Sequence, residues 1–404
     1  MGADMGALLH EVRTLRADMA ASGNSFRVMV RVVRKQWFLT GMVLAVVFAA
    51  IYPEASRKEA PLYPQYTVKY GAVGIIFLLS GLSLKTRQLG ASALAVKYNT
   101  YFFLWVFAVS PLAWFAVRSA LLASDWFSND ALLDGLVVMG VLPSTISSQI
   151  VLTQSMSGND AASLFNATFT NLVGVILSPA LLLLLLGNSG SLSFVSILVN
   201  LALSVVVPLL LGQIIQFFFA DQLKAAKIPY SYISKTILLI IIFFTFAKTF
   251  DEGVDLQWRA VLGILFILVA VHAGLQYAVL ASSRIPFLGF TRADSAAAFA
   301  GAVHKTVAVG ISIINVMYED SADLGVITIP LLIYHPMQLF FAGSFVTKLR
   351  NWVLADPNRV VVDDDDDAND GNIAYQPLLQ PSSYSAGSSS SATTTDDTSS
   401  TISS

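Results

Sequence analysis

The feature that most constrains this chain is a succession of ten apolar runs, each close to the roughly 20 residues that an α-helix needs to cross a bilayer. The runs are continuously apolar and lack the period-two alternation of membrane β-strands. Only 12% of the residues are charged, too few to cover the surface of a soluble fold of 404 residues. The sequence therefore predicts an all-α polytopic membrane protein with ten transmembrane helices, at 37–52, 66–84, 98–117, 131–154, 160–186, 192–219, 230–248, 259–281, 295–317 and 324–346.

The segments on either side of this membrane region differ from it in composition. Residues 1–36 are basic and polar, and residues 349–404 contain an acidic run, Asp363–Asp367, followed by a Ser/Thr-rich stretch. We expect a basic cytoplasmic segment, a ten-helix domain over 37–348 and a disordered tail. The chain has no Cys, which removes thiolate metal sites and Cys nucleophiles, and its net charge of −2 argues against nucleic acid as a partner.

The distribution of Lys and Arg predicts the orientation. If both termini are cytoplasmic, the inside segments hold 17 of the 24 Lys and Arg residues and the outside loops hold 6, with Lys305 inside the ninth run. The positive-inside rule then favours cytoplasmic N- and C-termini. Residues 375–379, Tyr-Gln-Pro-Leu-Leu, have the spacing of a sorting peptide. This motif, which can also arise by chance, predicts the plasma membrane or a Golgi or other endomembrane.

The fourth run carries a polar interruption at its middle. Proline removes an amide donor and clashes with the carbonyl four residues back, so we expect the helix to unwind and expose backbone groups to a cavity that binds a solute or ion. The alternative is a kinked helix whose Ser and Thr side chains bond their own backbone. The candidate binding residues here are Pro143, Ser144, Thr145, Ser147, Ser148 and Gln149.

The fifth run carries further polar side chains, at Asn166, Thr168, Thr170 and Asn171. Residues three and four apart share a helical face, so Thr170 and Asn171 are expected to face the interruption in the fourth run. One interpretation is that Thr168, Thr170 and Asn171 contribute to the same binding site. The other is that they make the interhelical hydrogen bonds common in membrane bundles.

The ninth run contains Lys305 near its middle, between His304 and Thr306. A lysine this far from either end cannot reach the interface, so its side chain must face polar groups. We interpret these three residues as part of the binding site. The alternatives are a structural lysine held by carbonyls and a hydrogen-bonded packing histidine. Pro336, among polar neighbours in the tenth run, predicts another break.

The interruptions recur at corresponding places in the two halves of the membrane region. Each half has five runs, so a repeat in the second half would insert upside down. The fourth member of each half is interrupted, at Pro143 and near Lys305, and the fifth has a late proline, Pro179 or Pro336. This pairing predicts two inverted five-helix repeats with a transporter site where broken helices 4 and 9 meet. No Asp or Glu lies deep in a run, which argues against a carboxylate-based cation/proton antiporter.

Six stretches carry a recognisable pattern: 80–86 (Ser-Gly-Leu-Ser-Leu-Lys-Thr), 142–153, 158–162 (Gly-Asn-Asp-Ala-Ala), Asn171-Leu172 with Ser178-Pro179, 304–306 (His-Lys-Thr) and 330–336 (Pro-Leu-Leu-Ile-Tyr-His-Pro). Together they resemble the bile acid:sodium symporter (SBF-like) superfamily, and most closely its sodium/bile acid cotransporter 7 branch. The resemblance extends over about 37–348. It implies a panel domain of helices 1, 2, 6 and 7 and a core domain of helices 3–5 and 8–10, in which broken helices 4 and 9 cross.

The resemblance also implies where sodium would bind. In that superfamily, sodium lies behind the crossing and is held by a Ser-Asn pair in helix 4, hydroxyls in helix 5, and a Glu with a Gln in helix 9. Carried over by position, Ser148 and Gln149 match the pair, and Thr168, Thr170 and Asn171 match the hydroxyl side. The sodium ligands would be Ser148, Gln149, Thr170 and Asn171. The Glu has no counterpart in the ninth run, which argues against sodium dependence.

This mismatch suggests a hypothesis for Lys305. If its ammonium occupies the place that sodium fills in relatives, a fixed charge replaces the mobile ion and transport no longer depends on sodium. In a second version, Lys305 gains and loses a proton, and transport is coupled to protons.

The sequence thus favours a secondary active transporter of the alternating-access type, which moves an organic anion or related small solute across the lipid bilayer. No cofactor other than the doubtful sodium is expected. The resemblance adds a role in cellular calcium homeostasis. The main alternative is a non-transporting regulator of calcium entry that contacts a calcium channel. An enzyme is disfavoured, because the sequence suggests neither a metal cluster nor a Ser-His-Asp arrangement.

Overall fold

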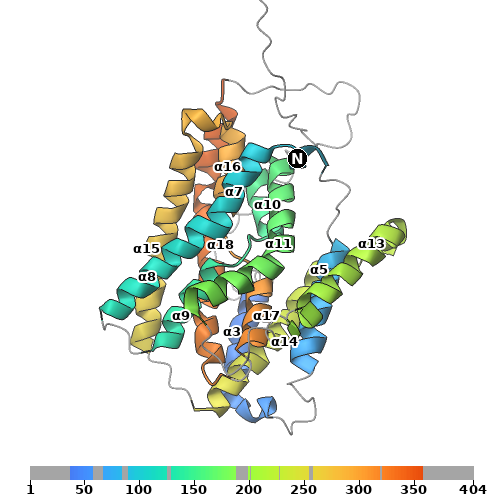
Figure 1. The fold of residues 1–404 in the computed structure, drawn as a ribbon, viewed down its shortest axis with the longest axis vertical. Coiled ribbons are helices and arrows are strands. Elements are labelled where there is room, and N and C mark those ends of the chain that lie inside the picture. The colour runs from blue at the N-terminus through green and yellow to red at the C-terminus, as the bar shows by residue number, and fades with distance from the viewer. Residues whose placement is uncertain are drawn as a thin grey trace, which may run out of the picture. The chain divides into compact units, whose positions relative to one another are not determined.

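Every regular element that the structure describes is a helix (Figure 1). The structure is a computed structural model that describes residues 37–57, 67–83, 90–124, 129–187, 199–200, 202–226, 228–253, 258–318 and 321–357. These all belong to the first of two units of the chain, residues 1–361. The predicted basic segment 1–36, the acidic and Ser/Thr-rich part of the tail, and the predicted sorting peptide lie outside the described residues.

Long apolar helices dominate this unit. Six helical stretches in the described ranges are long and apolar enough to cross a membrane, which confirms a polytopic all-α membrane protein. The expected helices at 37–52, 66–84, 131–154 and 295–317 coincide with shorter helical segments. In chain order the segments are α3 (Trp37–Ile51), η1 (Pro53–Ser56), η2 (Thr67–Ala72), α5 (Val73–Ser83), α6 (Gly90–Ala93), α7 (Val96–Leu104), η4 (Trp105–Val109), α8 (Ser110–Ala123), α9 (Asp130–Gly140), α10 (Ser147–Ser155), α11 (Asp160–Leu186), η5 (Ala202–Val206), α13 (Val207–Ala226), α14 (Tyr230–Asp251), α15 (Trp258–Ser283), η6 (Pro286–Leu288), α16 (Arg292–Gly301), α17 (Val307–Met317) and α18 (Leu324–Leu354).

Two of the expected spans are each divided into two helices. Residues 141–146 separate α9 from α10, and residues 302–306 separate α16 from α17. Pro143 explains the first interruption, because its ring cannot continue the hydrogen-bond ladder of α9. At the second, Thr306 has an extended backbone (φ −84°, ψ 126°) and starts α17. Each interruption leaves unpaired amide and carbonyl groups that need partners elsewhere.

The break predicted at Pro336 is wrong. Helix α18 continues from Leu324 to Leu354 with both Pro330 and Pro336 inside it. It packs against α9, α14, α15 and α17, so it is supported along its length. Neighbouring helices in a bundle can hold a proline-containing helix in place, whereas an isolated helix would kink or end.

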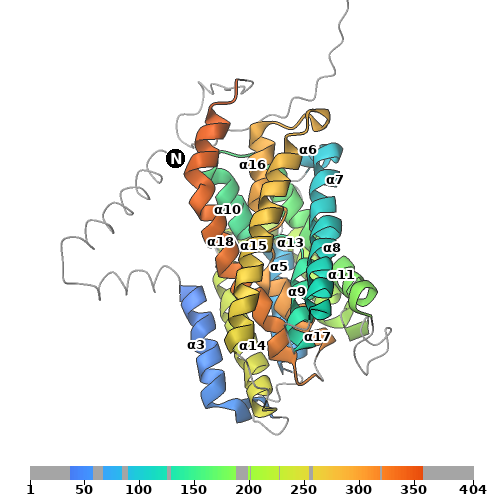
Figure 2. The ribbon, with the colours of Figure 1, turned by 90° about the vertical axis from the view of Figure 1, so that its left-hand side faces the viewer.

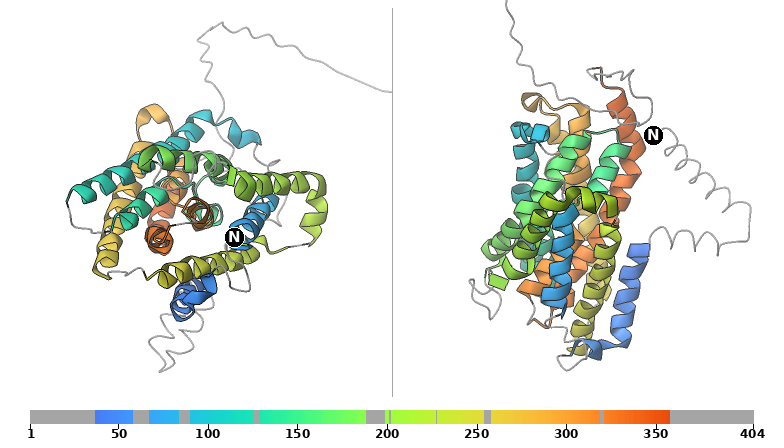
Figure 3. Two further views of the ribbon diagram at one scale, coloured as in Figure 1. Left: turned by 60° about the horizontal axis from the view of Figure 1, so that its bottom comes forward. Right: turned by 90° about the vertical axis from the view of Figure 1, so that its right-hand side faces the viewer.

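Helices from distant parts of the chain form close pairs. Helix α5 packs against α13, as Figure 1 shows, and α3 packs against α14, as Figure 2 shows. At the first pair, a Cβ added to Gly81 would lie 3.0 Å from the Cα of Gly212, and the reverse holds for a Cβ on Gly212. The two backbones therefore touch without intervening side chains. Seen from one end, the orange segments of α17 and α18 lie inside a ring of other helices (Figure 3).

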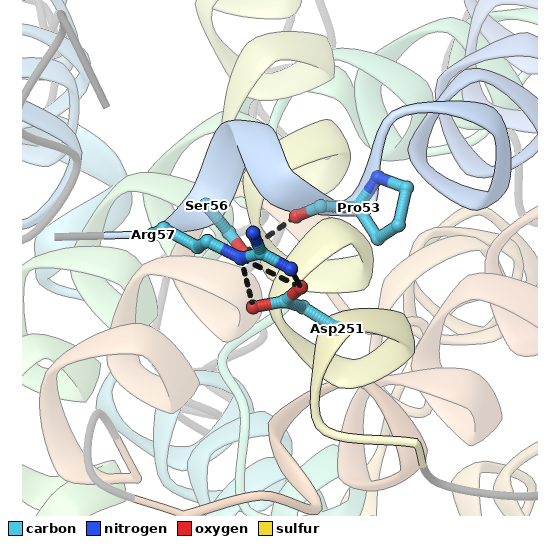
Figure 4. A network of polar contacts seen from close by, with 4 residues as sticks. All are labelled: Pro53, Ser56, Arg57 and Asp251. Carbon is cyan, nitrogen blue, oxygen red and sulfur yellow. Dashed lines mark hydrogen bonds and ion pairs between the residues drawn. The ribbon is translucent and has the colours of Figure 1, made fainter. Parts of the chain in front are cut away.

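A salt bridge between Arg57 and Asp251 lies at one end of the α3–α14 pair. The guanidinium of Arg57, after η1, contacts both carboxylate oxygens of Asp251 at the end of α14, at 2.8 Å to Oδ1 and 3.1 Å to Oδ2 (Figure 4). The Ser56 hydroxyl donates a 2.9 Å hydrogen bond to the carbonyl of Pro53 and closes the short turn that presents Arg57. The side chain of Arg57 is 57% exposed, so solvent screens this pair.

Candidate functional site

The two interrupted spans meet at their interruptions. The backbone amide of Thr306 donates to the carbonyl oxygen of Pro143 at 3.1 Å. The ammonium nitrogen of Lys305 lies 2.8 Å from the carbonyl oxygen of Leu142. Leu142 lies two residues after the C-terminal end of α9, where a helix has its partial negative charge, so the lysine is placed at a favourable position. We refer to residues 141–146 and 302–306 as the two breaks.

Carbonyl groups hold the charge of Lys305. The side chain is fully buried, and its Nζ also donates to the carbonyl oxygen of Val106 at 3.1 Å. Val106 lies in η4, a π-helical turn inserted between α7 and α8, and such turns are frequent at functional sites. No carboxylate among the described residues forms an ion pair with Lys305. Carbonyls from two other spans therefore supply the hydrogen-bond partners of the buried Lys305 nitrogen.

Gln338 of α18 holds the backbone of the second break. Its Oε1 accepts a 2.8 Å hydrogen bond from the amide of Lys305, and its Nε2 donates at 2.9 Å to the carbonyl of the same residue. The Gln338 side chain is fully buried. One side chain thus satisfies both backbone groups of an unwound residue, which fixes where the Lys305 side chain starts.

Helix α11 holds the first break from the other side. The hydroxyls of Ser144 and Thr170 lie 3.0 Å apart. The side-chain amide nitrogen Nδ2 of Asn171 donates at 2.6 Å to the backbone carbonyl of Ser144. Gly174 makes room for the ring of Pro143, since an added Cβ would lie 2.8 Å from two of its carbons. The structure therefore brings Pro143, Ser144, Thr170 and Asn171 together.

Three buried oxygens around the first break have no hydrogen-bond partner. They are Thr145 Oγ1, Gln149 Oε1 and Asn166 Oδ1. The Nε2 of Gln149 is used, because it donates at 3.1 Å to the carbonyl of Ser163 in α11. Buried polar atoms are normally paired, so these oxygens mark places where a solute, an ion or water would be stabilised.

The four predicted sodium ligands do not form one set. Thr170 and Asn171 bond to Ser144, whereas Gln149 bonds to Ser163. The Thr170 hydroxyl donates its hydrogen to the carbonyl of Asn166 at 2.7 Å, one turn back along α11. Ser148 is half-buried and hydrogen-bonds through its side chain to none of these residues. The arrangement fits a sodium ion poorly, because an ion needs several oxygens directed at one point.

The remaining predicted residues differ in position. Ser147 is exposed, and Thr168 is buried but not hydrogen-bonded through its side chain to either break. His304 is fully buried within the second break, and its Nε2 lies 3.5 Å from Nε2 of Gln276. Among the described residues, no group of three or more His, Cys, Asp and Glu could hold a metal ion.

Several polar residues beside the second break were not among the predicted binding residues. Tyr334 of α18 donates from its hydroxyl to the carbonyl of Val303 at 2.7 Å, and Nδ1 of His272 in α15 lies 2.8 Å from the same hydroxyl. Gln276, one turn further along α15, reaches His304. The signal was present, because three of the four histidines lie in the eighth, ninth and tenth apolar runs.

Known proteins similar to this chain are transporters. A family model described as the SBF-like CPA transporter family matches residues 36–351. A protein named sodium/bile acid cotransporter 7 from Danio rerio is 35% identical over 323 residues, covering 80% of this chain and 95% of the relative. Its namesake from Rattus norvegicus is 36% identical over 325 residues, with coverages of 80% and 95%. Solute carrier RCH1 from Candida albicans is 26% identical over 387 residues, with coverages of 83% and 93%.

These relatives are membrane solute carriers by name, which confirms the prediction of a transporter rather than an enzyme. The match covers the membrane region that contains both breaks. The chain belongs to the SBF-like CPA transporter family.

Proposed function

We propose that this chain is a secondary active transporter of the alternating-access type that carries an organic anion or related small solute and does not require sodium. The observation that carries the proposal is the Lys305 ammonium, 2.8 Å from the Leu142 carbonyl where the two breaks meet. The solute class is taken from the names of the relatives, which include bile acid.

Ten spans in two inverted repeats account for the helix contacts. An inverted repeat exchanges the first span with the sixth and the second with the seventh. Helices α3 and α5 belong to spans 1 and 2, and α13 and α14 belong to spans 6 and 7. The exchange therefore converts the contact between α5 and α13 into a contact between α14 and α3, and both contacts are present. It likewise converts the contact between α9 and α18 into that between α16 and α11. In this arrangement residues 37–348 form the transporter domain, with a panel of spans 1, 2, 6 and 7 and a core of spans 3–5 and 8–10.

The breaks are suited to an anionic solute. Helices α10 and α17 begin there, and the N-terminal end of a helix has partial positive charge. Lys305 adds a full charge nearby. In this proposal the solute binds beside Ser144, Thr145, Gln149 and Thr306, and the fixed charge of Lys305 replaces a mobile sodium ion.

Transport in liposomes tests this proposal. Purified full-length protein would be assayed for uptake of labelled bile acids and sulfated steroids, in sodium chloride and in choline chloride. We expect equal uptake in the two salts, and a loss of about tenfold or more in Lys305→Met, because removing a group that meets the solute charge costs at least about 1.4 kcal/mol. Lys348→Met, at an exposed lysine of α18, is the matched control and should transport normally. An unchanged rate and unchanged ion dependence in Lys305→Met would contradict the proposal.

A smaller substitution tests the fixed charge directly. Lys305→Ala leaves the carbonyls of Leu142 and Val106 without their cation. Added methylammonium or sodium should then restore part of the uptake, because a mobile cation can occupy the emptied position. Lys305→Ala that stays inactive in both salts while folding normally would argue that the lysine has another role.

The proposal extends to the cellular setting. Cytoplasmic termini, a location in the plasma membrane or a Golgi or other endomembrane, and a role in calcium homeostasis rest on the distribution of Lys and Arg, the tail motif and the family resemblance. The competing function is a non-transporting regulator of calcium entry that contacts a channel. That function predicts a calcium phenotype that survives replacement of Ser148, Gln149 and Lys305 and is lost when the tail is removed. The transporter predicts the reverse.

A further inference from the structure

Buried histidines gather beside the second break. His272 of α15 and His304 are both fully buried, and their ring centroids are 5.6 Å apart at an interplanar angle of 32°. Hydrocarbon surrounds such a bundle, so polar rings at this depth need partners within the protein. The solute site proposed above does not use His272.

The hydrogen bonds of Tyr334 fix the tautomer of His272. A tyrosine hydroxyl has one hydrogen, and Tyr334 gives it to the carbonyl of Val303 at 2.7 Å. The 2.8 Å contact between His272 Nδ1 and the Tyr334 oxygen therefore has Nδ1 as the donor. In a neutral ring the other nitrogen, Nε2, then carries a bare lone pair. This nitrogen is buried and has no hydrogen-bond partner.

Gln276 presents a second bare acceptor on the same face of α15. It lies four residues after His272, so the two side chains are neighbours on the helix. Its Nε2 donates to the carbonyl of Phe299 at 2.7 Å and points toward Nε2 of His304, at 3.5 Å. Its Oε1 is buried without a partner. Both atoms are acceptors, so neither can satisfy the other, whereas a hydrogen added to Nε2 of His272 would supply the missing donor.

We propose that His272 is a proton-binding site and that the proton is the ion coupled to transport. Hydronium supplies the proton: an O–H bond breaks, an N–H bond forms with the Nε2 lone pair, and water leaves. The new N–H donates to Oε1 of Gln276, while Nδ1–H keeps its bond to Tyr334. Because Nδ1 already donates to Tyr334, Nε2 of His272 is the nitrogen that the proton would occupy.

In the described part of the chain, no carboxylate is hydrogen-bonded to His272 or to Gln276. Helix α15 packs against α16 and α18, and no carboxylate from these helices bonds to the site. The titratable and charged groups that the neighbouring segments contribute are Tyr334, His335, Lys348 and Arg350 from α18, His304 and Lys305 from the second break, Arg292 and Asp294 at the start of α16, and Tyr101 of α7, which bonds to α15 at Val279.

The site is connected to the fixed charge of the transporter. His272 reaches the second break through Tyr334 and the Val303 carbonyl, two residues before Lys305. A proton on His272 adds a second positive charge in a region of low dielectric, and like charges there repel strongly. Protonation therefore weakens the hold of Leu142 and Val106 on the Lys305 ammonium. The coupling step rests on the proposed transport function, whereas the proton site does not.

Nitrogen NMR of the histidine rings tests the site without a solute. The full chain, labelled with 15N-histidine in lipid nanodiscs, contains four histidines, which single substitutions assign. We expect His272 to be neutral with its hydrogen on Nδ1 at about pH 8, and to become protonated reversibly as the pH is lowered to about 4, while His304 stays neutral. Gln276→Leu should keep His272 neutral over this range, and Gln222→Leu, at an exposed glutamine, should not change the titration.

Two NMR outcomes would overturn the site. A His272 ring that stays neutral throughout means that a bound water satisfies the two acceptors. Protonation of His272 and His304 in a single step means that the histidines titrate without the selectivity that Gln276 should provide. The titration is measured on the parent chain, and the substitutions serve only to assign its four histidine signals.

Liposome transport separates the site from the transport function. With a labelled bile acid as the probe, a pH gradient should change uptake by about fivefold or more in the parent chain and have no effect in His272→Asn. If His272 titrates but the liposomes carry no probe, the transport proposal fails and the proton site stands. If uptake occurs without dependence on the gradient, the proton coupling fails and transport stands.

Discussion

The backbone amide of Thr306 donates a 3.1 Å hydrogen bond to the carbonyl oxygen of Pro143, which joins the two interrupted spans at the points where each unwinds. An unwound segment inside a bilayer has no water to satisfy its backbone. Each break supplies a hydrogen-bond partner for a backbone group of the other. The side chains of Gln338 and Asn171 supply further partners. Neither break would be stable without its partner.

Gln338→Leu should destabilise the second break. The substitution leaves the amide and the carbonyl of Lys305 buried and unpaired, at about 1 to 3 kcal/mol for each group. We expect the free energy of unfolding in detergent to fall by about 2 to 6 kcal/mol. Ser344→Ala, at an exposed serine of the same helix, should change it by less than about 0.5 kcal/mol. Equal stability of the two variants would show that the clamp is not formed.

Gly174→Ala should disturb the first break. The added methyl group would lie 2.8 Å from the ring of Pro143 and would push it away from α11, at a cost of about 1 to 3 kcal/mol. Gly343→Ala is the matched control in α18, where nothing lies within 4 Å of the added Cβ. It should raise stability by up to about 1 kcal/mol, because alanine is the better helix former. The melting temperatures of both variants would be measured side by side. A shift of both in the same direction would contradict the close packing of Gly174 against Pro143.

Two salt bridges should respond differently to salt. Arg57 is 57% exposed in its pair with Asp251, whereas Arg118 and Asp134 are only 20% and 16% exposed and lie 2.6 Å apart. Asp251→Asn should lower the free energy of unfolding by at most about 1 kcal/mol, and the effect should disappear near 1 M salt. Asp134→Asn should lower the free energy of unfolding by more, and this loss should persist at high salt. The reverse order in a salt series would refute this ranking.

Tyr318 predicts a loss of stability at alkaline pH. Burial raises the pKa of Tyr318 to about 12, with Asp134 adding to the rise and Arg118 opposing it. The unfolded chain loses this proton near pH 10, and the folded chain loses it only near pH 12. Above pH 10 the unfolded state therefore binds fewer protons, and stability falls as pH rises through this interval.

Tyr318→Phe should remove this alkaline loss. Against the parent chain it should gain stability between about pH 9 and pH 11, by on the order of 1 to 2 kcal/mol. Denaturant unfolding at the two pH values measures the difference. Parallel pH dependence in parent and variant would exclude Tyr318 as the cause.

The sequence predicts the positions of the helices well because apolar run length reports directly on membrane crossing. Pro143 also marks the first break, since the loss of an amide hydrogen is a local property of proline. Pro336 misleads for the opposite reason: whether a proline ends a membrane helix depends on the neighbours that support it, and α18 has neighbours along its length. At Lys305 the apolar context predicts polar partners but not their identity.

The partners of Lys305 could not be read from the sequence because they are backbone carbonyls. Any residue can supply a carbonyl, and the one at Val106 comes from a π-helical turn that has no proline or glycine to reveal it. The tautomer of His272 is hidden in the same way, since it depends on Tyr334 and Val303 together. Ser147 shows the converse: a serine within a polar cluster turns out to be exposed.

The contact between Gly81 and Gly212 limits how the molecule can rearrange. Neither residue has a side chain that could rotate to absorb a shift, so α5 and α13 have essentially one permitted spacing. A sliding or separating motion between them would break this close backbone contact. If the protein opens and closes, we therefore expect α5 and α13 to move together as one rigid unit, with the hinges in other parts of the chain.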